Sequence, residues 1–202
     1  MSNCKNQNFT SKGEKETRYG HYQILAGQKD EHGSTHKNYK RKSDIRQEIR
    51  YISRKSTNTN PTDLLCYGAI NANARSVSAM IKDFESTHAL SRQCKDYRYL
   101  YHEVYYFSDK LTPYMEANKV NYPKLAKQLG KKVATSGDHN HHYQVAYAIH
   151  EKNDAEKTHI HFIVNSVDAC TFQKRRFLRK DKDELETLLN STVSDYIKND
   201  LQ

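Results

Sequence analysis

Hydrophobic residues recur along much of the chain at spacings of three and four, which is the period of an amphipathic helix. Over residues 43–55 the pattern is carried by Ile45, Ile49 and Ile52, and Ser43 stands where a capping residue is expected. A Thr-Pro pair opens another helical segment. We therefore expect helices over residues 43–55, 74–90, 112–130 and 183–199.

Other segments alternate apolar and polar residues or are rich in tyrosine and β-branched residues, as strands are. These segments are 20–27, 63–71, 97–107, 142–150 and 158–167. The polar segment 151–157 joins the last two as a hairpin loop. Because helices and strands do not alternate regularly, we expect an α+β fold around a mainly antiparallel sheet. Residues 1–42 are expected to form a polar arm with one strand, followed by a single domain over 43–202.

The charge of the chain favours a polyanionic partner. The 202 residues include 33 Lys and Arg against 24 Asp and Glu, a formal net charge of +9, and the pI is about 9.2. Nucleic acid is the first candidate for such a partner. The alternative is a basic protein without one.

Cysteine usage and hydropathy argue against several classes of protein. Cys4, Cys66, Cys94 and Cys170 show no Cys-x-x-Cys spacing, so a zinc ribbon is not expected. No signal-peptide pattern and no apolar run of membrane length are found, which argues against a secreted disulfide scaffold and against a membrane partner. A cytoplasmic location with reduced thiols is expected.

Three histidines of the predicted hairpin form a candidate metal site. His159 and His161 point to one face of their strand because side chains two residues apart share a face. His150 ends the partner strand, where Ala146 and Ala148 leave room above the sheet. Imidazoles suit a transition metal or another borderline divalent ion, and three protein ligands leave positions open for substrate. The alternative is a set of ordinary exposed histidines on a sheet face.

A metal with open positions can polarise a phosphate, and phosphodiester cleavage then needs a nucleophile. Tyr51 is the candidate, because it lies at the edge of the apolar stripe of the helix over 43–55, among basic residues. Glu48, one turn earlier, would take its proton or orient its hydroxyl. A boundary tyrosine that only packs its ring is the alternative, and Tyr39 is a second candidate nucleophile in a basic context.

Basic residues gather in two places, near this helix and after the hairpin. Such residues bind phosphates without reading sequence, and nearby aromatic rings would stack on the bases of a single strand. The alternative is a pair of solvated charge runs. The expected DNA-binding residues are Lys42, Arg46, Arg50, Arg54 and Lys55 in the first cluster, and Lys174, Arg175, Arg176 and Arg179 in the second.

The stretch "HEKNDAEKTHIHFIVNSV" resembles the third motif of the relaxase, or mobilisation nuclease, family of the HUH endonucleases, which plasmids and integrative elements carry. That motif has a histidine, an acidic polar spacer, His-x-His, an apolar run and an asparagine. The resemblance implies that His150, His159 and His161 are metal ligands and that Asn165 belongs to the motif.

Earlier stretches resemble the other motifs of this family. "IRYISRKST" is similar to the first motif, in which a tyrosine is the nucleophile, and Tyr51 takes that position. "YHEVYYFSDKLTP" is similar to the second motif, a strand with a serine near its end, and Ser108 is the nearest match. The segment between them, "LLCYGAINANARSVSAMIKDFEST", is also similar, so the resemblance extends from about residue 43 to the C-terminus.

The resemblance implies about five antiparallel strands flanked by helices, and nicking of single-stranded or hairpin origin-of-transfer DNA through a 5′-phosphotyrosyl intermediate. It also implies a divalent ion, Mg²⁺ or Mn²⁺ first, with Zn²⁺, Ni²⁺ or Co²⁺ as alternatives. Accessory mobilisation proteins and a coupling ATPase are the further implied partners, and Ser108 and Asn165 are expected to contact DNA. Lys152 replaces the family's usual aspartate, which leaves three alternatives for the acid that supports the ligands: Glu151, Asp154 or neither of them.

Two other functions fit the same residues. A rolling-circle replication initiator or a transposase of the HUH class would run the same chemistry on other DNA, but the position of Tyr51 before the histidine motif favours a relaxase. A non-catalytic basic DNA-binding module is the other alternative, with the histidines and a fourth protein ligand closing a structural metal site.

Overall fold

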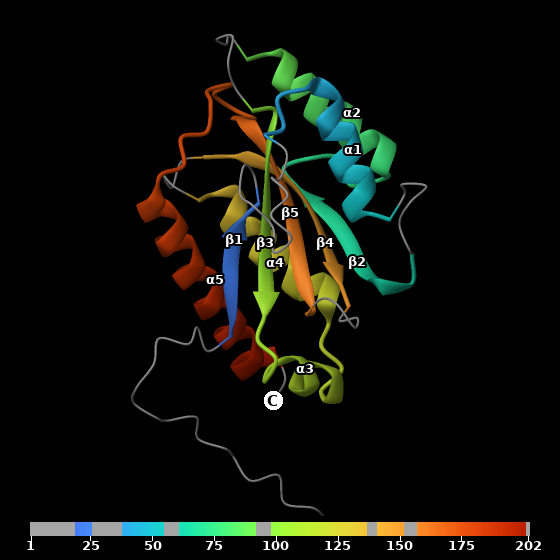
Figure 1. Cartoon of the computed structure of the whole chain (residues 1–202), viewed down its shortest axis with the longest axis vertical. Coiled ribbons are helices and arrows are strands. Elements are labelled where there is room, and N and C mark those ends of the chain that lie inside the picture. The colour runs from blue at the N-terminus through green and yellow to red at the C-terminus, as the bar shows by residue number, and fades with distance from the viewer. Residues whose placement is uncertain are drawn as a thin grey trace, which may run out of the picture.

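A computed structural model describes residues 19–25, 38–54, 61–91, 98–136, 141–151 and 157–200. Its centre is one five-stranded sheet in the order β1-β3-β5-β4-β2, and every neighbouring pair is antiparallel (Figure 1). The strands are β1 (Gly20–Ile24), β2 (Leu64–Ile70), β3 (Leu100–Phe107), β4 (Tyr143–His150) and β5 (His159–Asp168). The expected α+β fold with a mainly antiparallel sheet is confirmed.

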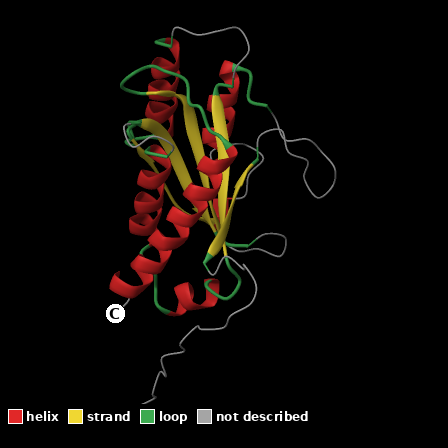
Figure 2. Cartoon of the chain, turned by 90° about the vertical axis from the view of Figure 1, so that its left-hand side faces the viewer, coloured by secondary structure: helices red, strands yellow, loops and turns green. Residues whose placement is uncertain are grey.

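Helices cover both faces of the sheet (Figures 1 and 2). On one face, here called the α1/α2 face, lie α1 (Lys42–Ile52) and α2 (Val77–Ala89). On the other, the α4/α5 face, lie α4 (Tyr122–Ala134) and α5 (Arg179–Asp200). The short helix α3 (Thr112–Ala117) follows β3. Among the described residues, no helix has the length and apolar character needed to cross a membrane.

The period of two along β5 divides its side chains between two separate cores. Ile160 and Phe162 are fully buried in the core of the α4/α5 face. Ile163 belongs to the core of the α1/α2 face, where Ile49 and Phe84 reach the sheet from α1 and α2. Burial of each such side chain contributes about 1.5–3 kcal/mol, so α1 is held firmly against the strands that carry the histidines.

Three local differences from the sequence expectations have simple causes. Arg41, and not Ser43, is the N-cap residue of α1, because the Asp44 carboxylate within the first turn accepts a hydrogen bond from the Arg41 amide at 2.9 Å. The single helix expected over 112–130 is two helices, because the Asn121 side chain accepts from the Lys124 amide and starts α4 anew. Helix α5 begins at Arg179, inside the segment expected to be a basic loop.

The strand expected within the N-terminal arm is β1, the edge strand that pairs with β3. The remainder of that arm, residues 1–18 and 26–37, lies outside the described residues.

Candidate active site

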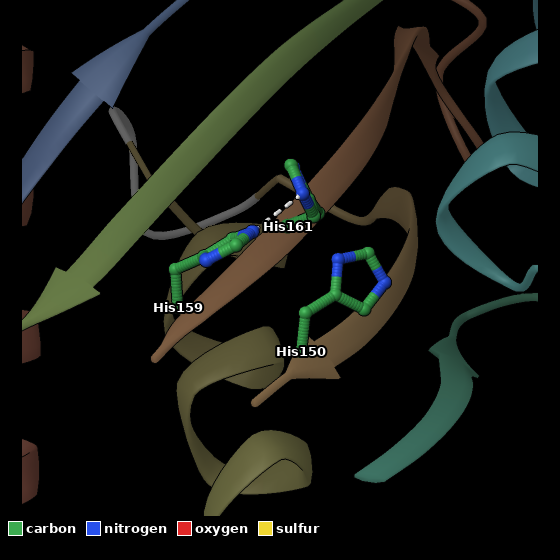
Figure 3. Close-up of side chains that lie close together, drawn as sticks. All are labelled: His150, His159 and His161. Atoms are coloured by element: carbon green, nitrogen blue, oxygen red, sulfur yellow. Dashed lines mark hydrogen bonds between the residues drawn. The ribbon is translucent and has the colours of Figure 1, made fainter. Parts of the chain in front are cut away.

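His150, His159 and His161 come together on the α1/α2 face (Figure 3). His150 and His159 stand directly opposite each other across β4 and β5, and His161 lies opposite Ala148. One nitrogen of each ring lies within 4.8 Å of the others, and the Nε2 atoms of His159 and His161 are 3.0 Å apart. The predicted convergence of the three rings is therefore what the fold produces.

Backbone carbonyls orient two of these rings. His150 Nε2 lies 2.8 Å from the carbonyl of Ile52, and His159 Nδ1 lies 2.6 Å from the carbonyl of Lys157. Each carbonyl fixes the tautomer in which that nitrogen donates, and the other ring nitrogen then keeps its lone pair. His150 Nδ1 and His159 Nε2 are thus available as ligand atoms, and the donor set fits a divalent metal ion.

An acid is linked to the third clustered ring, His161, through another histidine. His161 Nδ1 lies 2.9 Å from Nε2 of His102 on β3, and Nδ1 of His102 lies 3.4 Å from a carboxylate oxygen of Glu48. When His102 donates to Glu48, its Nε2 accepts from His161, and Nε2 of His161 is left with a lone pair. Glu48 thus contacts the histidine cluster through His102. Its role in taking the proton of Tyr51 or orienting its hydroxyl stays a prediction.

Arg54 links His150 to a second acid. Arg54 follows the end of α1 and has a left-handed backbone conformation, with a φ of 53°. The Arg54 guanidinium donates to both carboxylate oxygens of Asp63, at 2.8 and 2.5 Å, and to His150 Nδ1 at 3.0 Å. An ion bound at the histidines would take over this His150 lone pair. Within the part of the chain that the structure describes, Glu48 and Asp63 are the acids linked to the histidine cluster through a neighbouring side chain. Glu151 is exposed, and Asp154 lies outside the described residues.

Burial favours the neutral form of His150 and His161. It is the main cause that lowers the pKa of His150 to about 4; the hydrogen bond to the Ile52 carbonyl opposes this shift, and the charge of Arg54 contributes to it. Burial also holds the pKa of His161 well below its ordinary value, with repulsion from the neighbouring histidines adding to the effect. Metal binding needs unprotonated imidazole, so both rings are ready to ligate at neutral pH.

Tyr51 stands at the rim of the histidine cluster. The centroid of the Tyr51 ring is 6.1 Å from that of His161 and 5.4 Å from the Arg54 guanidinium carbon. Tyr51 is 39% exposed. Burial alone would lower the pKa of Arg54. The hydrogen bonds to Asp63 and its charge outweigh this effect, and Tyr51 adds to them in the same way, so that the pKa of Arg54 is raised. The rim position leaves the side chain of Tyr51 accessible to solvent.

The second candidate nucleophile, Tyr39, is in a different environment. It is 4% exposed, and its hydroxyl lies 3.1 Å from His102 Nδ1. Burial first, and the negative charge of Glu48 next, raise the pKa of the Tyr39 phenol far above its ordinary value. Tyr39 is therefore enclosed in the protein beside His102, whereas Tyr51 is exposed.

Two of the residues expected to bind DNA are buried instead. The Arg175 guanidinium forms an ion pair with Glu103 and donates to Ser136 at 2.7 Å, and both members of the pair are shielded from solvent. The Asn165 amide donates to the Phe84 carbonyl of α2 at 3.1 Å and is fully buried. Neither side chain is exposed at the surface, because the polar groups of both make hydrogen bonds inside the protein.

The other expected contacts differ in exposure. Lys42, Arg46 and Arg50 are exposed along α1, although Arg46 pairs with Glu85 at 3.3 Å. Four more residues stand in varied settings. Arg176 and Arg179 are exposed, Ser108 is half-buried after β3, and Lys174 donates to the Arg98 carbonyl at 3.0 Å. Lys55 lies outside the described residues.

Sequence reasoning missed His102 and Asp63. His102 lies within a tyrosine-rich strand, and the period of two gives its face, but only the pairing of β3 with β5 brings it beside His161. Asp63 precedes β2, and its partner Arg54 comes from the far side of a segment outside the described residues. Both signals depend on contacts between distant parts of the chain.

Comparison with protein families gives a match that covers more than half of the chain. Residues 51–196 match the family model "Relaxase: MobA/VirD2-like, nuclease domain". The matched range begins at Tyr51 and includes all three clustered histidines. No curated protein matches the chain. On the strength of the family model, the chain belongs to the MobA/VirD2-like relaxases, whose nuclease domains nick DNA in mobilisation.

Proposed function

We propose that this relaxase domain nicks single-stranded origin-of-transfer DNA and holds the cut strand covalently on Tyr51. The Tyr51 oxygen forms a bond to the scissile phosphorus, and the bond from phosphorus to the 3′-oxygen breaks. The phenolic proton ends on the departing 3′-oxygen. The products are a 5′-phosphotyrosyl link and a free 3′-hydroxyl, and attack by a second 3′-hydroxyl reverses the step and rejoins a strand.

His150, His159 and His161 would hold a divalent ion, for which we propose Mg²⁺ or Mn²⁺ first. Such an ion supplies Lewis-acid stabilisation of the negative charge that develops on the phosphate. The chain's own contribution is to present three oriented, neutral imidazoles. Among the described residues, no fourth Cys, His, Asp or Glu joins this group, which favours an open site over a closed structural one.

Arg54 and Arg50 supply positive charge beside Tyr51. The Arg54 guanidinium lies at the tyrosine ring and at His150, so a phosphate between these groups would receive charge-assisted hydrogen bonds. The rigid packing of α1 against the sheet holds the tyrosine in one orientation, as an in-line displacement requires. We propose a single strand as the substrate, since its phosphate can approach Tyr51 and the histidines without the opening of base pairs that a duplex would need.

The observation that carries this proposal is the distance of 6.1 Å between the ring centroids of Tyr51 and His161. The residues are far apart in sequence and meet only because α1 packs across β4 and β5. The test is incubation with origin-bearing single-stranded DNA and Mn²⁺, followed by a denaturing gel. We expect a slowly migrating covalent adduct that chelator prevents.

A matched tyrosine provides the control. Tyr114, on α3, is 42% exposed, close to the 39% of Tyr51. Tyr51→Phe should eliminate the adduct while Tyr114→Phe leaves it unchanged. Cleavage that needs no divalent ion, or hydrolysis without any adduct, would contradict the proposal.

A further inference from the structure

A basic hollow lies beside the candidate active site, between the end of α1, the start of α2 and the strand β2. Its volume is about 520 Å³, within the range of about 300–1,000 Å³ typical of small-molecule sites. None of the nuclease residues proposed above lines it except Arg50. The lining residues are Arg50, Tyr67, Arg75, Ser76, Val77 and Ser78.

The charge of the hollow suits a phosphate. Arg50 and Arg75 are both exposed, and within the described part of the chain no carboxylate pairs with either guanidinium. The neighbouring arginines of α1 differ, because Arg46 pairs with Glu85 and Arg54 with Asp63. Two guanidinium groups without acidic partners on one concave surface offer forked donors that match phosphate oxygens.

The same hollow contains a ring on which a base can stack. Tyr67 is 41% exposed, an unusual exposure for a tyrosine within a sheet that otherwise buries most of its rings. It stands opposite Ala148 on β4, so it projects from the α1/α2 face, the face of the histidines. Every base has a face that can stack on such a ring, whatever its sequence.

The register places this hollow close to the proposed chemistry. Tyr67 is opposite Ala148, and Ala148 is opposite His161. The backbones of Tyr67 and His161 are therefore two strand spacings apart, about 10 Å in all. Arg50 directly precedes Tyr51 on α1. A strand whose scissile phosphate lies at Tyr51 would therefore carry a neighbouring nucleotide past the hollow.

We propose that the hollow is a nucleotide subsite, in which Arg50 and Arg75 bind a phosphate of the substrate strand and Tyr67 stacks on the adjoining base. This inference rests on the proposed function, because it takes DNA as the ligand and Tyr51 as the point of cleavage. Tyr67 and Arg75 fix the position of the strand and take no part in bond breaking, whereas Arg50 also lies next to Tyr51 on α1. Loss of Tyr67 or Arg75 therefore weakens binding and leaves the reaction of fully bound DNA unchanged.

Affinity for a single-stranded oligonucleotide, measured by fluorescence anisotropy in a Tyr51→Phe background, tests the subsite without any cleavage. Tyr67→Ala should raise Kd about 5- to 150-fold, whereas Tyr67→Phe, which keeps the ring, should stay near the parent value. Arg75→Gln should weaken binding and reduce the slope of log K against log salt by about one. Tyr114→Ala and Lys127→Gln, exposed residues on α3 and α4, serve as matched controls.

An abasic scan locates the stacked base. Oligonucleotides that lack one base at a time near the nick should lose affinity at one position for the parent protein, and Tyr67→Ala should remove that loss. Identical losses in both proteins at every position, or a Tyr67→Ala Kd equal to that of Tyr114→Ala, would overturn the subsite. These binding results are separate from adduct formation, so a failure of the subsite and a failure of the proposed cleavage are told apart.

Discussion

Each face of the sheet buries an acid, and the two acids are used in different ways. On the α4/α5 face, Glu103 pairs with Arg175, which also donates to Ser136, and the pair is enclosed in protein. On the α1/α2 face, Glu48 faces His102, whose other ring nitrogen faces the ligand His161. The charge of Glu103 is neutralised inside the protein by Arg175. The contacts that start at Glu48 lead instead through His102 to His161, whose other ring nitrogen lies below the exposed Tyr51. A buried charge alone therefore does not indicate an active site; what does is a series of hydrogen bonds that leads from the charge to an accessible group.

The largest expected effect separates the two faces by activity. His159→Ala and His161→Ala should each lower nicking at least about a thousandfold, since metal stabilisation of developing charge is worth several kcal/mol. Both variants should keep the fold, because the apolar neighbours Ile160 and Phe162 that hold β5 face the other way. Single-turnover cleavage and thermal melting are the measurements. Near-normal nicking by either variant in excess chelator would contradict a role for a histidine-bound metal in cleavage.

The next effect concerns stability on the opposite face. Arg175→Met leaves Glu103 buried without its partner, so we expect a loss of about 3–5 kcal/mol in the free energy of unfolding. The double variant Arg175→Met with Glu103→Leu should recover part of that loss. Urea unfolding measures both, and nicking per folded molecule should stay unchanged. A stable Arg175→Met protein with weakened DNA binding would restore Arg175 to the DNA surface.

A smaller effect tests the acid of the histidine face. Glu48→Gln keeps the shape of the side chain but removes the charge that orients His102, so metal affinity should fall about 10- to 100-fold. Isothermal titration with Mn²⁺ is the measurement, and Glu85→Gln on α2 is a matched acidic control at a distance from the ligands. Equal metal affinity in the two variants would mean that His161 needs no support from Glu48.

The smallest effect at neutral pH is a pH dependence of stability. Burial lowers the folded-state pKa of His150 to about 4 and holds that of His161 well below its ordinary value. Between the folded pKa of His150 and the ordinary value near 6.5, the unfolded chain binds more protons, so stability should rise with pH across that interval and level off above it. Urea unfolding of metal-free protein tests this. His150→Gln should flatten the rise, and an unchanged curve would contradict it.

Local patterns were enough to predict the histidine cluster but not its surroundings. His159 and His161 share a face by the period of the strand, and a hairpin brings His150 opposite, so all three followed from neighbouring residues. The supports of these ligands come from β3 and from the two ends of a segment outside the described residues. Such contacts depend on sheet register, which one sequence does not reveal.

The basic run after β5 shows the same limit. Arg175 and Arg176 are neighbours of identical type, yet Arg175 is buried beside Glu103 and Arg176 is exposed. The partner that decides between them lies on β3, far away in the chain. The break between α3 and α4, in contrast, could have been predicted from the local sequence. Asn121 and the proline two residues later are a helix-capping signal, which the prediction of one long helix did not take into account.

The central claim is that Tyr51 carries the cut DNA strand, and the most direct measurement is mass-spectrometric mapping of the covalent adduct. After digestion by protease and nuclease, we expect one DNA-linked peptide, with the nucleotide on Tyr51, and no such peptide from Tyr51→Phe. A nucleotide found on Tyr39 or on any other tyrosine, or an adduct still formed by Tyr51→Phe, would contradict it.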